Sequence, residues 1–334
     1  MYHKGVVAGD FHGPDYSPAG VALICELNRE HKADCFFFNG DVADFGQVSK
    51  YGPNPFSSEN ILEEANILLE KVLIPILESL DLEITWHYEQ VSPGDPELKN
   101  AKVLIVDSCE NRRGVKIWWE EGNHEYRLKV HLRNKSIETR GLISMEKVFN
   151  LAKLGIQYVH SHSSQGNGIL ILTPNLMIMH GNTTGVNQAK NQLNKTMMST
   201  IVNHGHHQGF SRQSSDVSGK DIVCYANGSM CRSQHYSSTS TVNHGFISFW
   251  YDDEPPYRFA VFQNNLVCDG EHLPGDPRAY PRTVAEAVKT ILLTPWGEYR
   301  AVEHAPGKWS VRKTWGEAHA GALEPGKARK RSKA

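Results

Sequence analysis

Five short segments of the sequence place aspartate, asparagine or histidine directly after an apolar run. Histidine is also abundant, with 17 residues in a chain of 334. Imidazole nitrogens and carboxylate oxygens are common ligands of zinc, iron and manganese in proteins. We therefore predict a metal centre, provided that the fold brings the five segments together. They are Asp10 with His12, Asp41, Asn123 with His124 and Glu125, His180, and residues 203–207 (NHGHH).

The apolar runs predict the elements that position these residues. Residues 4–9 and 34–41 are predicted as buried strands, and residues 18–31 between them space their apolar side chains as a helix does. A strand, a helix and a second strand in this order form a βαβ unit, whose strands pair in parallel. Ligands gather outside the carboxyl ends of strands in an open α/β sheet, so the five segments are predicted to face one crevice.

The rest of the chain is predicted to be mixed, with more strand in its second half. A helix over residues 58–80 should be kinked or shortened by Pro75. Residues 84–114 are expected to be irregular apart from a strand at 102–106, and a strand from residue 115 should break at Gly122. Further helices are expected at 124–133, 143–154 and 185–195, and further strands at 156–160, 169–172, 175–179, 199–203, 222–226, 245–251 and 257–262.

Two divalent metals in one site would explain the mixture of residue types. Metals about 3.5–4 Å apart need an anionic ligand that bridges them, which aspartate can provide. Neutral imidazole and amide groups complete each shell without adding charge. Such metals lower the pKa of bound water from about 15.7 to about 7, which generates a hydroxide nucleophile, and they neutralise charge on phosphoryl oxygens.

The motifs D-x-H, G-D, G-N-H-E, H-G and a final histidine pair, in this order, resemble those of the calcineurin-like metallophosphoesterases. The layout is similar to that of the phage and prophage members. The resemblance covers roughly residues 5–265 and depends on DFH, NGDVAD and EEGNHEYR together. It implies an α/β fold, a four-layer αββα sandwich with the dimetal site at the carboxyl ends of the strands. It also implies two divalent ions, manganese foremost, with iron, zinc or nickel as alternatives.

The resemblance further implies a role for each motif residue. Asp10, His12 and Asp41 would hold the first metal, with Asp41 bridging. Asn123, His180 and a later histidine would hold the second. Outside the metal shell, His124 would act as general acid or transition-state donor oriented by Glu125, and Arg127 would help to hold the substrate phosphate.

The last motif departs from the family's G-H-x-H and leaves two registers open. Residues 205–208 (GHHQ) keep the glycine but put glutamine where the second ligand belongs. Residues 203–206 (NHGH) keep two histidines, His204 and His206, and put Asn203 in the place of glycine. We favour the second register, because alternate residues of an extended segment point the same way and asparagine tolerates positive φ.

Several polar and aromatic residues have a structural explanation as well. Asp10, Asp41 or His180 taken singly could be a strand-end cap, a turn former or a buried histidine, and only their joint order favours a site. Asp44 is expected either to support the site or to be a solvated loop residue. His160, His162 and His244 are expected to be structural or exposed, and Trp118 and Trp119 to belong to the core.

Composition sets broad limits on function. The formal net charge is −2, which is not typical of a nucleic-acid binder, although it allows a local basic groove. No run of about 18 apolar residues and no signal-peptide pattern occur, so no membrane association is expected. Six cysteines without C-x-x-C spacing predict reduced thiols and a cytoplasmic protein. The resemblance to phage and prophage members implies a bacterium or a phage-infected host cell.

The predicted function is hydrolysis of phosphate esters. The resemblance to phage and repair relatives implies phosphodiesters of nucleic acid or nucleotides as the favoured substrates. The alternatives are a phosphomonoesterase, including a protein phosphatase, and a metal-stabilised binding protein without turnover. Residues 1–270 are predicted to form the metallophosphoesterase domain, residues 271–324 a weakly patterned extension, and residues 325–334 a basic, structureless tail.

Overall fold

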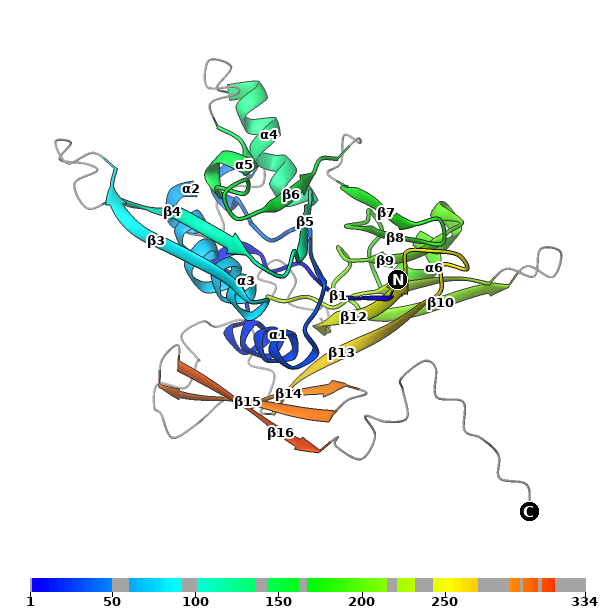
Figure 1. Ribbon diagram of the computed structural model, residues 1–334. Helices are drawn as coiled ribbons and strands as arrows, with labels where there is room; N and C mark the ends of the chain where they lie inside the picture. Colours follow the sequence, from blue (N-terminus) through cyan, green and yellow to red (C-terminus); the bar gives the residue numbers. More distant parts are fainter. Residues whose placement is uncertain are drawn as a thin grey trace.

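The computed structural model describes most of the chain. The described ranges are residues 2–49, 60–91, 101–135, 143–161, 167–214, 221–231, 243–269, 289–294, 297–305 and 308–315, with side chains described as far as residue 264. The strands form three sheets, and helices lie on the outer sides of the two larger ones (Figure 1).

The main sheet has nine strands in the order β16-β15-β14-β13-β12-β1-β2-β5-β6. Helix α1 (Pro18–His31) connects β1 (Tyr2–Ala8) to β2 (Cys35–Asn39), and these two strands pair in parallel, which confirms the predicted βαβ unit. Ser17 begins the helix, because its hydroxyl accepts a hydrogen bond from the backbone N–H of Gly20 at 3.1 Å. The other parallel strands are β5 (Lys116–Glu120) and β6 (Ile156–Val159), and the antiparallel ones are β12 (His244–Asp252), β13 (Phe259–Asp269), β14 (Lys289–Thr294), β15 (Gly297–Ala305) and β16 (Lys308–Trp315).

A second sheet of five strands packs against the main sheet. Its order is β10-β11-β9-β8-β7, and both β8 with β9 and β9 with β11 pair in parallel. The strands are β7 (Ile169–Thr173), β8 (Leu176–Met179), β9 (Ser199–Val202), β10 (Gly209–Ser214) and β11 (Asp221–Ala226), and α6 (Gln188–Thr196) follows β8 in the chain.

The alternation of side chains along the strands produces four layers. In β2, Phe36 and Phe38 face the core under α1, whereas Phe37 faces the second sheet. In β8, Ile178 meets the main sheet and Met179 packs on the far side, in the cluster that includes residues of α6. The order helix, sheet, sheet, helix therefore confirms the predicted α/β sandwich.

The region between residues 58 and 114 departs in part from expectation. The predicted long helix is divided into α2 (Ile61–Leu68), a π-helical turn η3 (Leu69–Leu73) and α3 (Ile74–Ser79). The break directly precedes Pro75, which has no N–H to continue the helical ladder. In residues 84–114 the strand predicted at 102–106 is confirmed as part of β4 (Lys102–Asn111). The irregular structure predicted around it is wrong, because β3 (Leu82–Gln90) pairs with β4 in an antiparallel hairpin. One face of the hairpin is solvated, which weakens its apolar signal in the sequence.

Helix α4 agrees with its predicted range, whereas α5 is shorter than predicted. Helix α4 (Asn123–Lys135) follows β5 as predicted. Helix α5 (Met145–Val148) is only one turn, although a helix to residue 154 was predicted. Asn150 has a left-handed backbone with a φ of 51°, which an α-helix cannot accommodate, so the chain continues in turns. The other short elements are η1 (Gly13–Asp15) and η2 (Gly46–Val48).

The C-terminal part contributes strands to the main sheet. β14, β15 and β16 continue it beyond residue 270, where a weakly patterned extension was predicted, and they lie beside α1 (Figure 1). The predicted basic tail, residues 325–334, lies outside the described residues. The five cysteines whose side chains are described are unpaired, and four of them are buried. None of the helices in the described part of the chain combines the length and hydropathy needed to cross a bilayer.

Candidate metal centre

The predicted site residues meet where parallel strands of both sheets end. Asp10 and Asp41 are each the second residue after their strand, β1 and β2, and His180 directly follows β8. The chain segments stay side by side beyond the strands, because Asp10 N donates to Gly40 O at 3.0 Å and Asn203 N donates to His180 O at 3.0 Å. The convergence inferred from the apolar runs is therefore confirmed.

The side chains form two adjacent clusters that could each hold a metal ion. Asp10, His12 and His206 make the first cluster, in which His206 Nε2 lies 3.4 Å from Asp10 Oδ1 and 3.1 Å from His12 Nε2. Asp41, His180 and His204 make the second. Within each cluster the potential ligand atoms lie within 4.8 Å of one another. Both clusters combine one carboxylate with two imidazoles, a donor set that suits divalent transition metals.

Asp41 occupies a central position in the second cluster. Its Oδ2 lies 3.3 Å from His180 Nε2 and 3.7 Å from His124 Nε2, and its Oδ1 accepts the backbone N–H of His124 at 2.8 Å. Asn123 Oδ1 is 3.2 Å from His180 Nε2, so the amide also faces this cluster. The prediction that Asp41 bridges two ions is compatible with this position and stays a prediction, as does the assignment of ligands to each ion.

His204 and His206 face different clusters, and the favoured register, in which both bind metal, stays a prediction. His207 belongs to neither cluster, and the side chain of Gln208 donates to Asn264 O at 3.3 Å. The reasons given for that register were wrong in two respects. The segment is bent rather than extended, and the positive φ values belong to His204 (77°) and His206 (54°), not to Asn203.

Asp44 supports the site and is not a solvated loop residue. It is buried, and its Oδ1 lies 2.7 Å from His124 Nδ1 and 3.5 Å from His12 Nδ1. The geometry also groups these three residues within ligand distance of one another. The imidazole of His124 is thus held in place by a carboxylate that the sequence left undecided.

Glu125 does not orient His124, which corrects the role implied for it. Its carboxylate accepts four backbone N–H groups, from Gly122, Asp41, Val42 and Ala43, at 2.7–3.0 Å. Successive residues of a helix point about 100° apart, so Glu125 and His124 face different surroundings. Glu125 fixes the loop that carries Asp41 instead.

Glu64 is a supporting residue that the sequence analysis missed. It is fully buried on α2 and accepts the backbone N–H groups of Asp44 at 2.6 Å and Phe45 at 3.0 Å. Burial raises the pKa of Glu64 to about 6. A single glutamate on an amphipathic helix gives no signal in the sequence that it reaches a loop 20 residues away.

Arg127 lies at the open side of His124. Its Nη2 is 2.8 Å from His124 Nε2, and its Nη1 donates to Asp44 O at 3.0 Å. A guanidinium group only donates hydrogen bonds, so His124 Nε2 accepts and the Nδ1–H faces Asp44. The arginine side chain is 25% exposed, which leaves it free to meet a ligand at the mouth of the site.

The charges of the site are strongly coupled. Burial opposes ionisation of Asp10, but His206 and His180 lower its pKa to about 2. Burial likewise opposes ionisation of Asp41, and His124 and His180 hold the pKa of that carboxyl well below its usual value. Burial would lower the pKa of His180, yet Asp41 raises it to about 10, whereas burial and His180 lower the pKa of His204 to about 4.

These charges fit divalent cations. The proton on His180 balances a carboxylate, and a metal ion bound there would replace it, because metal ligands must be deprotonated. Two further polar atoms, Asp10 Oδ1 and His206 Nδ1, are buried without a hydrogen-bond partner. Buried polar atoms normally have hydrogen-bond partners. A bound cation would give these two atoms a partner, and the neighbouring carboxylates would balance its charge.

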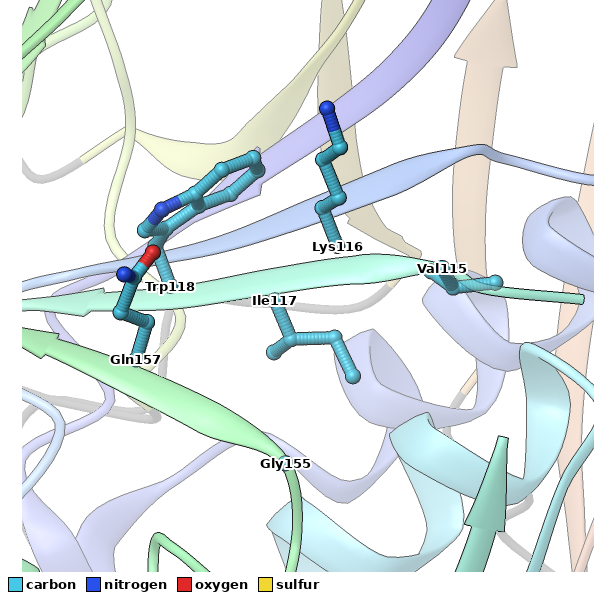
Figure 2. Close-up of a pocket in the computed structure, with 6 residues that line it drawn as sticks. All are labelled: Val115, Lys116, Ile117, Trp118, Gly155 and Gln157. Carbon is cyan, nitrogen blue, oxygen red and sulfur yellow. The ribbon is translucent and has the colours of Figure 1, made fainter.

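A surface pocket elsewhere is unrelated to these clusters. It has a volume of about 460 Å³ and is lined by Lys116, Trp118 and Gln157 among others (Figure 2). It lies where β5 and β6 begin, at the opposite end of the strands from Asn123. Trp119 is fully buried, as predicted, while Trp118 is half-buried and stacks on Phe37 with ring centroids 4.7 Å apart.

The other histidines remain outside the site. His160 is exposed and lies 2.9 Å from Glu146, and His244 begins β12. His162 lies outside the described residues.

Comparison with known proteins yields structural similarities only. No family model and no curated protein matches the chain. Among solved structures it is similar to a conserved uncharacterized protein of Streptococcus pneumoniae described as a predicted phosphoesterase, with 12% identity, coverage of 94% of this chain and 99% of that one, and a TM-score of 0.27. It is also similar to a dimetal phosphatase of Danio rerio, with 8% identity, coverage of 93% and 98%, and a TM-score of 0.29. TM-scores this low carry no weight for the activity, so the proposal below starts from the residues of this chain.

Proposed function

We propose that this protein is a metal-dependent hydrolase of phosphate esters that holds two divalent ions, manganese foremost. The observation that carries the proposal is the pair of adjacent clusters, Asp10–His12–His206 and Asp41–His180–His204, with His124 beside both. Asn123 would complete the second cluster. The ions, when bound, would supply Lewis-acid activation of water and would neutralise charge on the phosphoryl oxygens.

His124 would supply the proton for the leaving group. Its ring lies against His12, with centroids 4.5 Å apart, and is held by the Asp44 carboxylate through Nδ1. Nε2 is then the atom that faces the reaction, and a positioned general acid contributes about 10²–10⁴-fold to the rate. Glu64 and Glu125 would act on the same loop by fixing Asp44 and Asp41.

Arg127 would bind a phosphate oxygen of the substrate. Its hydrogen bond to His124 Nε2 occupies the position where a leaving-group oxygen would lie, so substrate binding requires the guanidinium to turn toward the phosphate. Guanidinium groups bind phosphate oxygens in a forked geometry. This exchange would free Nε2 to take up a proton from water, so that His124, as an imidazolium held by Asp44 through Nδ1, can then donate that proton to the leaving group.

The favoured substrates are phosphodiesters of nucleic acid or nucleotides. Helix α4 leads away from the site and carries two exposed basic side chains, Lys129, which lies 3.6 Å from Glu121 Oε2, and Arg133. Cations along such a path favour a ligand with several phosphates over a single terminal phosphate. We further infer a cytoplasmic protein, since the described cysteines are unpaired thiols.

A hydrolysis panel with added Mn²⁺ tests the proposal. It comprises single- and double-stranded DNA, RNA, a cyclic nucleotide, bis-p-nitrophenyl phosphate and p-nitrophenyl phosphate. Cleavage of diesters is expected. Cleavage of the monoester alone would make the protein a phosphomonoesterase, and no cleavage by fully metal-loaded protein would leave a metal-stabilised binding protein.

A further inference from the structure

Three asparagines meet beside Asp10 where strands of both sheets end. Asn39 is the last residue of β2 in the main sheet, and Asn203 and Asn227 directly follow β9 and β11 in the second sheet. All three side chains are fully buried. Amides buried this deeply are stable only when their hydrogen-bonding groups find partners.

The asparagines form a chain of hydrogen bonds that ends on Asp10. Asn39 Nδ2 donates to Asn203 Oδ1 at 2.8 Å, and Asn227 Nδ2 approaches the same oxygen at 3.4 Å. Asn203 Nδ2 donates to Asp10 Oδ2 at 3.0 Å. Because a carboxylate only accepts, the NH₂ group of Asn203 must be the one that faces Asp10.

The two carboxylate oxygens of Asp10 differ in the hydrogen bonds that they accept. Oδ2 accepts from Asn203 Nδ2 and from the backbone N–H of His204 at 3.1 Å. Oδ1 is buried without a hydrogen-bond partner and lies 3.4 Å from His206 Nε2. One oxygen is thus saturated and the other points into the first cluster.

Glycine at position 203 would supply only part of this arrangement, because it lacks the amide that donates to Asp10 Oδ2. The amide of Asn203 lies against Gly9, where an added Cβ would come within 2.9 Å of its Nδ2. The backbone of Gly9 and the amide therefore fit closely, and removal of the amide would leave the backbone N–H of His204 as the one remaining donor to Oδ2 among the described residues. Hydrogen bonds from outside a metal shell commonly orient the ligand within it.

We propose that Asn203, anchored by Asn39, is a positioning residue that aims Oδ1 of Asp10 at a metal ion in the first cluster. The proposal rests on the metal centre proposed above. It assigns to asparagine a specific duty at the position where the motif would otherwise have glycine.

Metal titration of buried-amide variants tests this assignment. Mn²⁺ binding to wild type, Asn203→Ala, Asn39→Ala and the double variant is measured by calorimetry, together with denaturant unfolding of the metal-free proteins. Asn28→Ala is the matched control, because Asn28 is equally buried and donates to Ser79 Oγ at 2.9 Å, far from the clusters in α1. In Asn203→Ala we expect one of the two Mn²⁺ affinities to fall about 10–100-fold and the other to stay unchanged.

The remaining variants locate the effect. Asn39→Ala should weaken the same Mn²⁺ site by a smaller factor, and the double variant should be no weaker than Asn203→Ala alone, because both act through one chain of bonds. Asn28→Ala should keep both affinities even if it lowers stability. If Asn203→Ala fails to fold, Asn203→Ser and Asn39→Ala provide the same comparison.

Three results would overturn the proposal: unchanged Mn²⁺ binding in Asn203→Ala, an equal loss in Asn28→Ala, or a wild-type protein that binds no Mn²⁺. Failure of the proposed function would look different. A wild-type protein that binds two Mn²⁺ and cleaves no phosphate ester would remove the hydrolase assignment, and the effect of Asn203→Ala on affinity would still be measurable.

Discussion

Replacing Gly122 with alanine would test how closely the segment around residue 123 fits against the Asp41 loop. An added Cβ would lie 2.8 Å from Glu125 Oε2, and closer still to the Oδ1 and the backbone N of Asp41. Ordinary contacts of Cβ atoms begin near 3.4 Å, so Glu125 must retreat by about 0.6 Å and Asp41 by more. Both neighbours belong to the site, and one of the clashing atoms is backbone, which cannot turn away.

The size of the effect follows from this displacement. A shift of about 1 Å in a catalytic group can lower the rate about 10²-fold. The overpacking itself is expected to lower the free energy of unfolding by about 1–3 kcal/mol. Asp41 faces His180 and His124, so Mn²⁺ binding in the second cluster should weaken as well.

The assay compares Gly122→Ala with Gly209→Ala. At Gly209 the nearest atoms to an added Cβ are methyl carbons at 3.7 and 3.8 Å, so this variant should behave as wild type. Turnover of bis-p-nitrophenyl phosphate at saturating Mn²⁺, Mn²⁺ calorimetry and denaturant unfolding are measured for both. If Gly122→Ala kept the turnover and the Mn²⁺ affinity of wild type, the segment around residue 122 would not pack as closely against Asp41 as the structure indicates.

Three further predictions concern individual residues. His124→Ala should lower turnover about 10²–10⁴-fold while Mn²⁺ stoichiometry stays at the wild-type value, and equal turnover would remove the proton-donor role. His204→Ala should weaken Mn²⁺ binding and His207→Ala should not, because only His204 lies in a cluster; the reverse result would contradict the favoured register. Burial raises the pKa of Glu120 to about 8, well above its ordinary value of 4.5, so between pH 4.5 and pH 8 the folded protein keeps a proton there that the unfolded chain releases. The free energy of unfolding is highest below pH 4.5, where Glu120 is protonated in both states. It falls as the pH rises toward 8, by roughly 4 kcal/mol at pH 7.5. Glu120→Gln should therefore be more stable than wild type at pH 8 and equally stable at pH 4.5 in metal-free denaturant unfolding, and a pH-independent difference would contradict this.

The sequence predicted the strands that position the site because their signal is local. Each apolar run ends at a polar residue, and parallel pairing then brings those ends together, as at Asp10 and Asp41. The role of Asp44 stayed open in the sequence because burial of a loop residue depends on what covers it. Here Glu64 from α2 covers it through two backbone N–H groups.

The sequence could not predict hydrogen-bond partners that depend on the direction in which a side chain points. Glu125 was assigned to His124 because the two are adjacent in the sequence, but helical geometry turns it to the Asp41 loop. Strand β3 and the strands β14–β16 were missed for another reason. β3 has a solvated face and therefore lacks a continuous apolar run, and the pairing of β14–β16 is decided by the neighbouring strands.

Five residues of the two clusters have a backbone conformation that favours glycine, which indicates that their side chains are needed for the chemistry of the site. Asp10, His12, Asp41, His204 and His206 have φ values between 49° and 77°, in the left-handed region that favours glycine. Each such residue costs about 1–3 kcal/mol and persists only where its surroundings enforce it. At Asp10 and His12 the enforcement is visible, because their N–H groups bond to Gly40 O and Asp41 O at 3.0 and 2.9 Å. Glycine would relieve the strain at each position but would remove a carboxylate or an imidazole from a cluster. The fold accepts this cost at residues that follow strands of both sheets, and it thereby holds the carboxylates and imidazoles close together before any ion binds. A site arranged in advance can bind a metal tightly with little rearrangement.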